Sequence, residues 1–313
     1  MNINVPTVSV VMITYQHESY IREAVEGVLM QQCSFDVELI IANDCSPDNT
    51  RHIIHEIIDN HPNGKWIKYI EQETNLGMIP NFIYALKECK GQYIALCEGD
   101  DYWTHPLKLQ KQVDFLSNNF DYSMCFHEIY SFREGAKEEQ LHCSNLNKVS
   151  FALKDIVLAN FIPTCSVLLR KACLPPFNYF YYFRIGDWPL YIYLLTDNYN
   201  AFFINEPLAK YRIHPNGIFS QADQSEALEI SLSILENAKK YFNRNIVVFN
   251  SGIIKLEYAL FIRKAYKSGK LFDFLFLKKI IFKWGGAAAL EYQIKALFII
   301  LFPCVYKRLI NKI

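Results

Sequence analysis

YIALCEGDDYW, residues 93–103, is the stretch that decides the fold. Its apolar first half, Tyr93–Cys97, predicts a strand that is buried on both faces, and Glu98, Asp100 and Asp101 follow it directly. Three carboxylates at the end of a buried strand repel one another unless a positive charge lies among them. A hard divalent cation that prefers oxygen ligands, Mg²⁺ or Mn²⁺, fits this place. The alternative is a solvated acidic loop, because short acidic clusters are common.

The residues before this stretch alternate strand and helix patterns. β-branched apolar runs predict strands at 8–14 and 37–42, and a further strand is expected at 66–70. Apolar residues at helical spacing predict helices at 20–29, after Ser46-Pro47-Asp48, and at 80–89. The βαβαβ order implies right-handed crossovers and a doubly wound sheet, whose ligands bind beyond the carboxyl ends of the strands.

Polar residues follow these strands where a ligand is expected. Thr14 and Tyr15 follow the first strand, and Asp44 lies in ANDCSPDNT, residues 42–50, after the second. A carboxylate there can accept a hydrogen bond from the imide N–H of uracil or thymine, whereas Ser46 and Asp48 are placed to cap the next helix. Neither GxGxxG nor GxxxxGK[ST] occurs, which argues against a dinucleotide-binding domain and a P-loop NTPase.

After this stretch, short strands are expected at 122–130, 165–169 and 201–204, and the chain changes character near residue 220. We predict an α/β catalytic domain at 1–220 and an α-helical region at 221–313. The segment 271–313 is rich in Phe and Leu, and such cationic, aromatic helices can lie in a membrane interface with anionic headgroups. The alternative is a helical subdomain that packs on the core or on a second subunit. Its basic residues are Lys278, Lys279, Lys283, Lys295, Lys307, Arg308 and Lys312.

The composition argues against one class of binding partner and indicates the cellular compartment. The 313 residues have a formal net charge of zero and a pI near 7.1, which argues against nucleic-acid binding. The nine cysteines contain no CxxC pair, which favours reduced thiols in a cytoplasm. Neither a signal peptide nor an apolar run long enough to span a bilayer is recognisable. We therefore expect a cytoplasmic protein that is peripheral at the inner face of the membrane.

Four blocks together resemble glycosyltransferase family 2, which has the GT-A fold. They are VSVVMITYQHESYIREAVEGVLMQQ (8–32), VELIIANDCSPDNT (37–50), NLG (75–77) and YIALCEGDDYWTHPLKLQKQVDFL (93–116). The resemblance implies a nucleotide-diphospho-sugar transferase fold, a doubly wound mixed sheet with an α-helical C-terminal region. It also implies an inverting transferase that uses Mn²⁺ or Mg²⁺.

Carried onto this sequence, the resemblance implies roles for single residues in donor binding. Thr14 and Tyr15 would line the nucleoside pocket, Asp44 would contact the base, and Asn75 and Gly77 would belong to the donor-binding turn. Asp100 would face the ribose or sugar side, and Asp101 would be the metal ligand. Two positions depart from the family pattern: Glu98 stands where many members have an aspartate, and Pro80 where many have an arginine.

Two later segments extend the resemblance. TCSVLLR (164–170) is similar to the family strand that forms the floor of the acceptor site. FRIGDW (183–188) is similar to the segment that carries the catalytic base. Inverting transfer needs a carboxylate to take the acceptor proton, which implies Asp187, a residue that is also placed to cap the helix after it. Gly186 stands where many members have an acid.

YRIH (211–214) resembles the segment before a mobile loop, so Arg212 or His214 would bind diphosphate or metal. The signature QxxRW is absent, which favours addition of a single sugar over polymerisation. We expect the donor to be a UDP-sugar in preference to a dTDP- or GDP-sugar. The expected acceptor is a saccharide or lipid-linked saccharide of a cell-surface glycan.

One alternative is a catalytically silent family member that serves as a membrane-bound assembly partner. Another is a sugar nucleotidyltransferase, although the loop after the first strand, TYQHESY, lacks the glycine-rich basic character of those enzymes. The oligomeric state stays open.

Overall fold

The computed structural model describes residues 6–217, 223–242 and 245–267. The chain divides into two compact units, one of residues 1–156 and 160–217 and one of residues 157–159 and 218–313. The first unit carries the predicted site residues. Segment 271–313, for which membrane contact is predicted, lies outside the described residues. Within the described ranges, no helix has both the length and the apolarity that crossing a bilayer requires.

The first unit contains ten strands and six α-helices in its described part. The strands are β1 Val8–Thr14, β2 Val37–Asn43, β3 Ile67–Glu71, β4 Tyr93–Leu96, β5 Tyr102–Trp103, β6 Tyr122–Arg133, β7 Glu139–Leu141, β8 Ser150–Phe151, β9 Leu168–Arg170 and β10 Asn200–Ile213. Its longer helices are α1 Ile21–Leu29, α2 Thr50–Asn60, α3 Met78–Glu88, α4 Lys108–Asn118 and α6 Asp187–Leu194, and α5 Leu153–Ile156 is a single turn. The 3₁₀ turns used below are η2 Thr164–Ser166 and η4 Phe177–Tyr182.

The strands form one mixed sheet in the order β3-β2-β1-β4-β9-β6-β10-β5. β1 pairs parallel with β2 and β4, and β2 pairs parallel with β3. β9 lies antiparallel between β4 and β6, so the sheet changes from parallel to mixed at this strand. The predicted doubly wound mixed sheet is confirmed. Its topology brings β10, from the end of the unit, back against the acidic stretch through β5.

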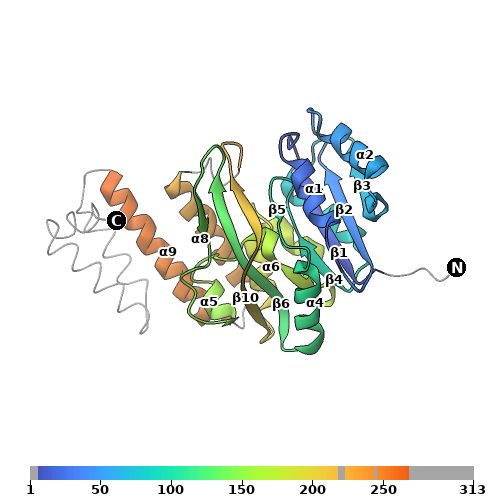
Figure 1. The fold of residues 1–313 in the computed structure, drawn as a ribbon. Helices are drawn as coiled ribbons and strands as arrows, with labels where there is room; N and C mark the ends of the chain where they lie inside the picture. The colour runs from blue at the N-terminus through green and yellow to red at the C-terminus, as the bar shows by residue number, and fades with distance from the viewer. Residues whose placement is uncertain (1–5, 218–222, 243–244, 268–313) are drawn as a thin grey trace. The chain divides into compact units, whose positions relative to one another are not determined.

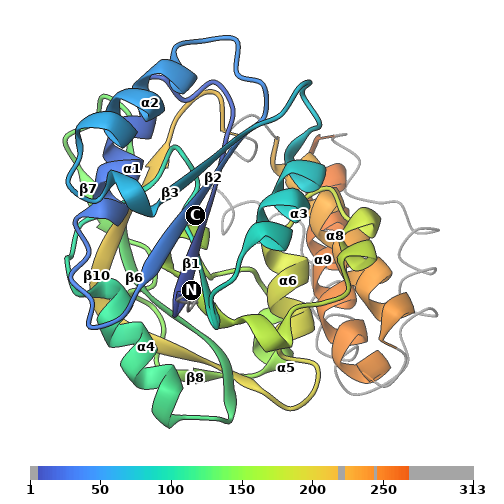
Figure 2. The ribbon, with the colours of Figure 1, turned by 90° about the vertical axis from the view of Figure 1, so that its right-hand side faces the viewer.

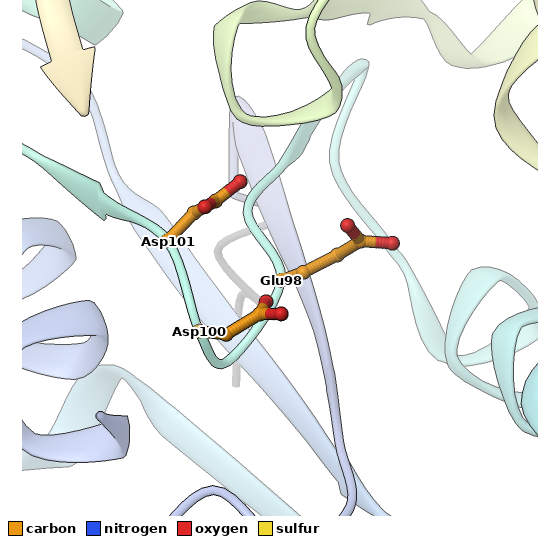
Figure 3. Close-up of side chains that lie close together, drawn as sticks. All are labelled: Glu98, Asp100 and Asp101. Carbon is orange, nitrogen blue, oxygen red and sulfur yellow. The ribbon is translucent and has the colours of Figure 1, made fainter. Parts of the chain in front are cut away.

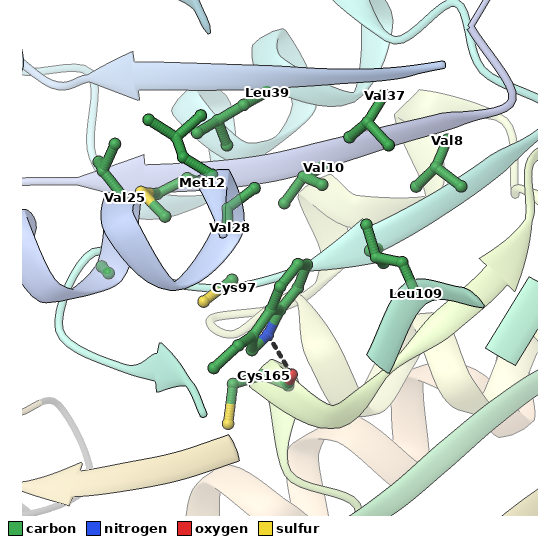
Figure 4. Close-up of a cluster of buried hydrophobic side chains, with 14 of the residues drawn as sticks. Val8, Val10, Met12, Val25, Val28, Val37, Leu39, Cys97, Leu109 and Cys165 are labelled. Carbon is green, nitrogen blue, oxygen red and sulfur yellow. Dashed lines mark hydrogen bonds between the residues drawn. The ribbon is translucent and has the colours of Figure 1, made fainter. Parts of the chain in front are cut away.

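Helices cover both faces of this sheet. Figure 2 shows α1, α2 and α4 on one face and α3 and α6 on the other. Because both faces are covered, β1 reads as a continuous apolar run rather than an alternating one. The face under α1, α2 and α4 holds a large apolar cluster, part of which is drawn in Figure 4. This packing fixes the strand ends where the polar residues project (Figure 1).

The second unit contains two long described helices, α8 Gln224–Tyr241 and α9 Ile246–Lys267. Asp223 caps α8, because one of its carboxylate oxygens accepts hydrogen bonds from Ser225 N at 2.6 Å and Glu226 N at 3.1 Å. Gly252 on α9 lies so close to residue 157 that a Cβ would be 2.2 Å from the Val157 carbonyl oxygen. The helical character predicted beyond residue 220 is seen in both helices, and the boundary itself stays a prediction.

Local boundaries differ from the sequence expectation at three places. β10 runs from Asn200 to Ile213, far beyond the expected strand at 201–204, because its second half pairs with β6 after a bulge at Pro207. α6 begins at Asp187, and the N-cap position is Gly186, so Asp187 lies in the first turn rather than at the cap. The N-cap position of α2 is Asn49 rather than Ser46 or Asp48, and the Asp48 carboxylate accepts from Thr50 N, the first residue of the helix, at 3.1 Å.

Candidate functional site

The loops after β1 and β2 are bound to each other. Gln16 N donates to Ser46 Oγ at 3.0 Å, His17 N donates to Thr50 Oγ1 at 3.1 Å, and Glu18 N donates to Asp48 Oδ2 at 3.1 Å. Gln16 has a φ of +58°, a left-handed conformation that is strained for a residue with a side chain. Cys45 in the facing loop has the same φ of +58°. The two loops therefore form one rigid wall at the carboxyl ends of β1 and β2.

This wall carries the residues predicted for the nucleoside. Thr14 is buried at the end of β1, and no described residue forms a hydrogen bond with its Oγ1. Tyr15 is 39% exposed beside it. Asp44 is only 4% exposed, and its two carboxylate oxygens accept hydrogen bonds from Leu76 N at 2.8 Å and Gly77 N at 2.9 Å. Asp44 therefore fixes the turn that the sequence assigns to donor binding.

The donor-binding turn also stabilises itself. The Asn75 side chain accepts from Gly77 N at 3.0 Å, and Gly77 has a φ of +84°, which favours glycine. The structure thus brings Asp44, Asn75 and Gly77 together, as the sequence predicts. Each Asp44 oxygen keeps a second lone pair, so contact between this carboxylate and a base stays a prediction.

The three acidic side chains after β4 converge. One carboxylate oxygen each from Glu98, Asp100 and Asp101 lies within 4.8 Å of the others (Figure 3). Asp101 is 1% exposed; its Oδ1 accepts from Arg212 N at 2.9 Å, and its buried Oδ2 accepts no hydrogen bond of ordinary geometry from a described residue. Glu98, which departs from the family pattern, thus lies in the same group as Asp101, the predicted metal ligand.

The electrostatics of this group fit a cation. Burial raises the pKa of Glu98 and of Asp101 well above the ordinary range, and the neighbouring carboxylates raise both further. Carboxylate oxygens at this spacing need only a small closure to bind one octahedral Mg²⁺ or Mn²⁺, whose opposed ligands are about 4.2 Å apart. The unpartnered Asp101 Oδ2 is the oxygen that such an ion would satisfy. The acidic group therefore suits a divalent metal.

Two histidines flank Asp100. His214 Nε2 lies 3.0 Å and His17 Nε2 lies 3.9 Å from Asp100 Oδ2. Burial raises the pKa of Asp100, but the His214 hydrogen bond and the charge of His17 outweigh burial and leave this pKa below the ordinary value. Gly99 is tightly enclosed, because a Cβ there would lie 2.8 Å from both His17 Nδ1 and Thr14 Oγ1. Sequence analysis missed His17; its position three residues after β1, among other strand-end polar residues, was the available signal.

Arg212 binds the backbone of the acidic loop. Its Nε donates to the Asp100 carbonyl oxygen at 3.0 Å, and one guanidinium nitrogen donates to Glu23 at 2.5 Å. Three aromatic rings surround its guanidinium carbon at 4.8–5.4 Å: Tyr20, Tyr102 and Phe132. These contacts describe a residue that positions Asp100 and Asp101, while its predicted contact with diphosphate stays a prediction.

Asp187 lies at the start of α6 on the same site. Its Oδ2 accepts from Asn160 Nδ2 at 3.0 Å, and burial raises its pKa above the ordinary value. Its negative charge contributes to the raised pKa of Glu98, which places the two carboxylates within electrostatic range of each other. The helix behind it is anchored by Trp188, whose indole N–H donates to the Ile156 carbonyl oxygen at 2.9 Å. A fixed, partly buried carboxylate with a raised pKa is suited to accept a proton.

The departure at Gly186 has a packing explanation. A Cβ there would lie 3.0 Å from Phe82 Cδ1 and 3.6 Å from Ile79 Cδ1, both on α3, the helix that also carries Pro80. Phe82 in turn packs edge-on against Phe180 of η4, with ring centroids 5.7 Å apart. An acidic side chain before Asp187 would therefore displace an aromatic contact, so α3 occupies the space that an acid would need.

This chain is similar in sequence to known glycosyltransferases. The family model described as glycosyl transferase family 2 matches residues 9–174. The uncharacterised protein Rv1520 of Mycobacterium tuberculosis is 36% identical over 223 residues, which cover 68% of this chain and 61% of that relative. The chain thus matches less than two thirds of the length of this relative. The putative teichuronic acid biosynthesis glycosyltransferase TuaG of Bacillus subtilis is 27% identical over 218 residues, which cover 69% of this chain and 82% of that protein.

Solved structures share the architecture. The structure of S. aureus TarS 1–349 in complex with UDP-GlcNAc superposes with a TM-score of 0.61 at 18% sequence identity, covering 88% of this chain and 78% of that one. At this identity the likeness concerns the fold alone. Together with the family match over more than half of the sequence, the likeness confirms the prediction made from the four sequence blocks. This chain belongs to glycosyltransferase family 2 and has the GT-A fold.

Proposed function

We propose that this chain is an inverting, metal-dependent glycosyltransferase. It transfers a single sugar from a nucleotide-diphosphate sugar to a hydroxyl of a saccharide or lipid-linked acceptor in cell-surface glycan synthesis. The observation that carries the proposal is the convergence of Glu98, Asp100 and Asp101 around the unpartnered Asp101 Oδ2, with Asp187 within electrostatic range. One acidic group is suited to the donor and the other to the acceptor.

The donor half of the site begins at the loops after β1 and β2. Thr14, Tyr15 and Asp44 hold the nucleoside, and the turn fixed by Asp44 closes one side of that pocket. Asp101, assisted by Glu98, holds Mn²⁺ or Mg²⁺. Such a cation neutralises the diphosphate and so stabilises the charge that develops on the leaving nucleotide. Asp100, held by His214, faces the ribose or sugar side of the donor.

The acceptor half of the site depends on Asp187. Its carboxylate removes the proton of the acceptor hydroxyl while that oxygen attacks the anomeric carbon from the face opposite the diphosphate. The new glycosidic C–O bond forms as the bond between the anomeric carbon and the diphosphate oxygen breaks, and the configuration inverts. The Asn160 hydrogen bond at 3.0 Å orients Asp187 without taking its second oxygen.

The donor base and the pathway rest on the relatives. The TarS structure holds UDP-GlcNAc, which supports a UDP-sugar, and TuaG is named for teichuronic acid biosynthesis, which supports a cell-surface glycan. Peripheral contact with an anionic membrane at the inner face rests on residues 271–313, whose Lys and Arg would favour anionic lipid.

Nucleotide release from a panel of UDP-, dTDP- and GDP-sugars, with Mn²⁺, with Mg²⁺ and with chelator, tests this proposal. The variants are Asp101→Asn and Asp187→Asn, and the matched control is Asp59→Asn on the exposed side of α2. Metal-dependent release from one donor, lost in both site variants and kept in the control, supports the proposal. If no donor reacts or binds with any metal, even with membrane extract as the acceptor source, the silent-partner alternative replaces it.

A further inference from the structure

A lysine lies entirely inside the protein behind the acidic group. Lys108, the first residue of α4, has 0% exposure. Lysine is almost never fully buried unless it is paired with an opposite charge, yet no ion pair of Lys108 exists in the described part of the chain. The ionisable groups that interact with it are the His127 imidazole and four thiols: Cys33, Cys97, Cys125 and Cys165. Burial lowers the pKa of Lys108 to about 8, so the ammonium is still mostly protonated at neutral pH.

The ammonium makes two contacts of good geometry. Lys108 Nζ donates to Gln112 Oε1 at 2.8 Å, and it lies 3.8 Å from the centroid of the Trp103 ring. A cation over an indole face is attracted by the ring quadrupole, and the attraction is strongest where water is excluded. Lys108 therefore holds the side chains of Gln112 and Trp103 at the same time.

Each of these two side chains holds the turn that faces the acidic group. The Trp103 indole N–H donates to the Cys165 carbonyl oxygen at 2.8 Å, the dashed line in Figure 4. Gln112 Nε2 donates to the next carbonyl oxygen, that of Ser166, also at 2.8 Å. Two consecutive carbonyls of η2 are thus fixed through one lysine.

The same lysine reaches Asp101 through the backbone. Trp103 follows Asp101 by two residues and pairs with Ala209 of β10, the strand whose Arg212 N–H binds Asp101 Oδ1. The Cys165 thiol, on the turn just described, lies within electrostatic range of Asp101. The backbone of Trp103 cannot move toward α1, because Gly27 of that helix packs closely against it.

Stability alone does not account for a charge in this place. Replacement of buried charges by apolar side chains of similar volume is often neutral or stabilising, because desolvation of an ion is costly. A methionine would fill the same space next to Trp103 without that penalty. The contacts of the ammonium therefore point to a role in geometry rather than in folding.

We propose that Lys108 is a positioning residue for the cation site: by holding Trp103 and Gln112, it fixes the directions of Asp101 and of the 164–166 turn. The inference rests on the proposed metal dependence. Loss of the ammonium leaves the backbone of β5 paired with β10 but removes the contacts that hold the Trp103 ring and the Gln112 amide in their present directions. The acidic group then samples geometries that bind a cation less well.

The test is Mn²⁺ binding to the full chain, followed by electron paramagnetic resonance of free Mn²⁺, for the wild type and Lys108→Met. The matched control is Lys111→Met on the same helix, where Lys111 forms a surface ion pair with Glu206. We expect Lys108→Met to weaken Mn²⁺ binding by about tenfold, with Tm unchanged or raised, and Lys111→Met to bind as the wild type does. We also expect excess Mn²⁺ to restore most of the kcat of Lys108→Met, which a general loss of structure would not allow.

If Lys108→Met folds and binds Mn²⁺ with wild-type affinity, this inference is overturned while the proposed metal dependence stands. If Lys108→Met does not fold, Trp103→Phe replaces it, because phenylalanine keeps a ring near the ammonium and removes the hydrogen bond to Cys165. Weaker Mn²⁺ binding by folded Trp103→Phe supports the inference, and unchanged binding overturns it. Absence of Mn²⁺ binding in the wild type overturns both this inference and the proposed metal dependence.

Discussion

Gly27 in the middle of α1 allows this helix to approach the backbone of Trp103 in β5 closely. A Cβ at this position would lie 2.8 Å from the Trp103 carbonyl oxygen and 2.9 Å from Trp103 N, closer than real Cβ atoms come. Alanine in a helix interior is favoured over glycine by about 1 kcal/mol, but overpacking of this kind costs about 1–3 kcal/mol. Both clashing atoms are backbone, so the contact cannot be relieved by a rotamer change, and the upper part of that range applies.

We therefore expect Gly27→Ala to destabilise the protein by about 1–2 kcal/mol, which lowers Tm by about 2–8 °C for a unit of this size. Relief of the clash moves β5, and with it Asp101, so Mn²⁺ binding should weaken as well. Thermal unfolding with chelator and Mn²⁺ titration measure the two effects. The control is Glu26→Ala, on the exposed face of the same helix, where loss of the 3.9 Å pair with Arg22 changes stability by less than about 0.5 kcal/mol. A Tm that rises in Gly27→Ala would show that helix propensity exceeds the clash and would refute the reasoning.

Three further predictions concern the charged groups. Because the folded-state pKa values of Glu98 and Asp101 are raised, the folded chain binds more protons than the unfolded chain above the ordinary carboxyl range. The contribution of these two carboxyls to the unfolding free energy with chelator should thus fall as pH rises, whereas the buried His17 and His127, whose pKa values are lowered, contribute in the opposite direction. The difference in Tm between Mn²⁺ and chelator isolates the carboxyls and should increase from about pH 5 to pH 8, and a difference that does not change with pH contradicts the prediction. Asp44→Asn replaces one of two acceptor oxygens by a donor, so that Leu76 N or Gly77 N loses its acceptor on residue 44, although Gly77 N keeps the Asn75 oxygen. The variant should be less stable by about 1–3 kcal/mol and have a higher KM for donor, measured by urea unfolding and kinetics. Asp187→Asn should lower kcat by about 10²–10⁴-fold while Mn²⁺ binding stays at the wild-type value, and equal losses of both would assign Asp187 to the metal instead.

The local sequence pattern was sufficient to predict the parallel half of the sheet. β1 and β2 are short β-branched runs whose partners follow closely in sequence, and their burial under helices on both faces requires them to be apolar throughout. Since parallel strands end at the same sheet edge, the placement of Thr14, Asp44 and Asp101 at one edge followed from the order of the elements. The acidic group after β4 was therefore predictable from the chain alone.

The other half of the site depends on long-range pairing that no local pattern encodes. The second half of β10 mixes apolar and polar residues because it lies between β6 and β5 rather than in the centre of the apolar cluster, so its length was underestimated. That pairing carries Arg212 and His214 to the acidic loop, where His214 meets Asp100 from more than a hundred positions away.

By itself, the sequence determined the family, the α/β class and the strand-end acids, because these follow from side-chain periodicity and from the order of neighbouring elements. Only the tertiary structure decided that His17 and His214 share Asp100 and that Lys108 lies buried behind Trp103. The physical reason is that these contacts join side chains from strands and helices far apart in the chain, whose distances are set by sheet order and packing.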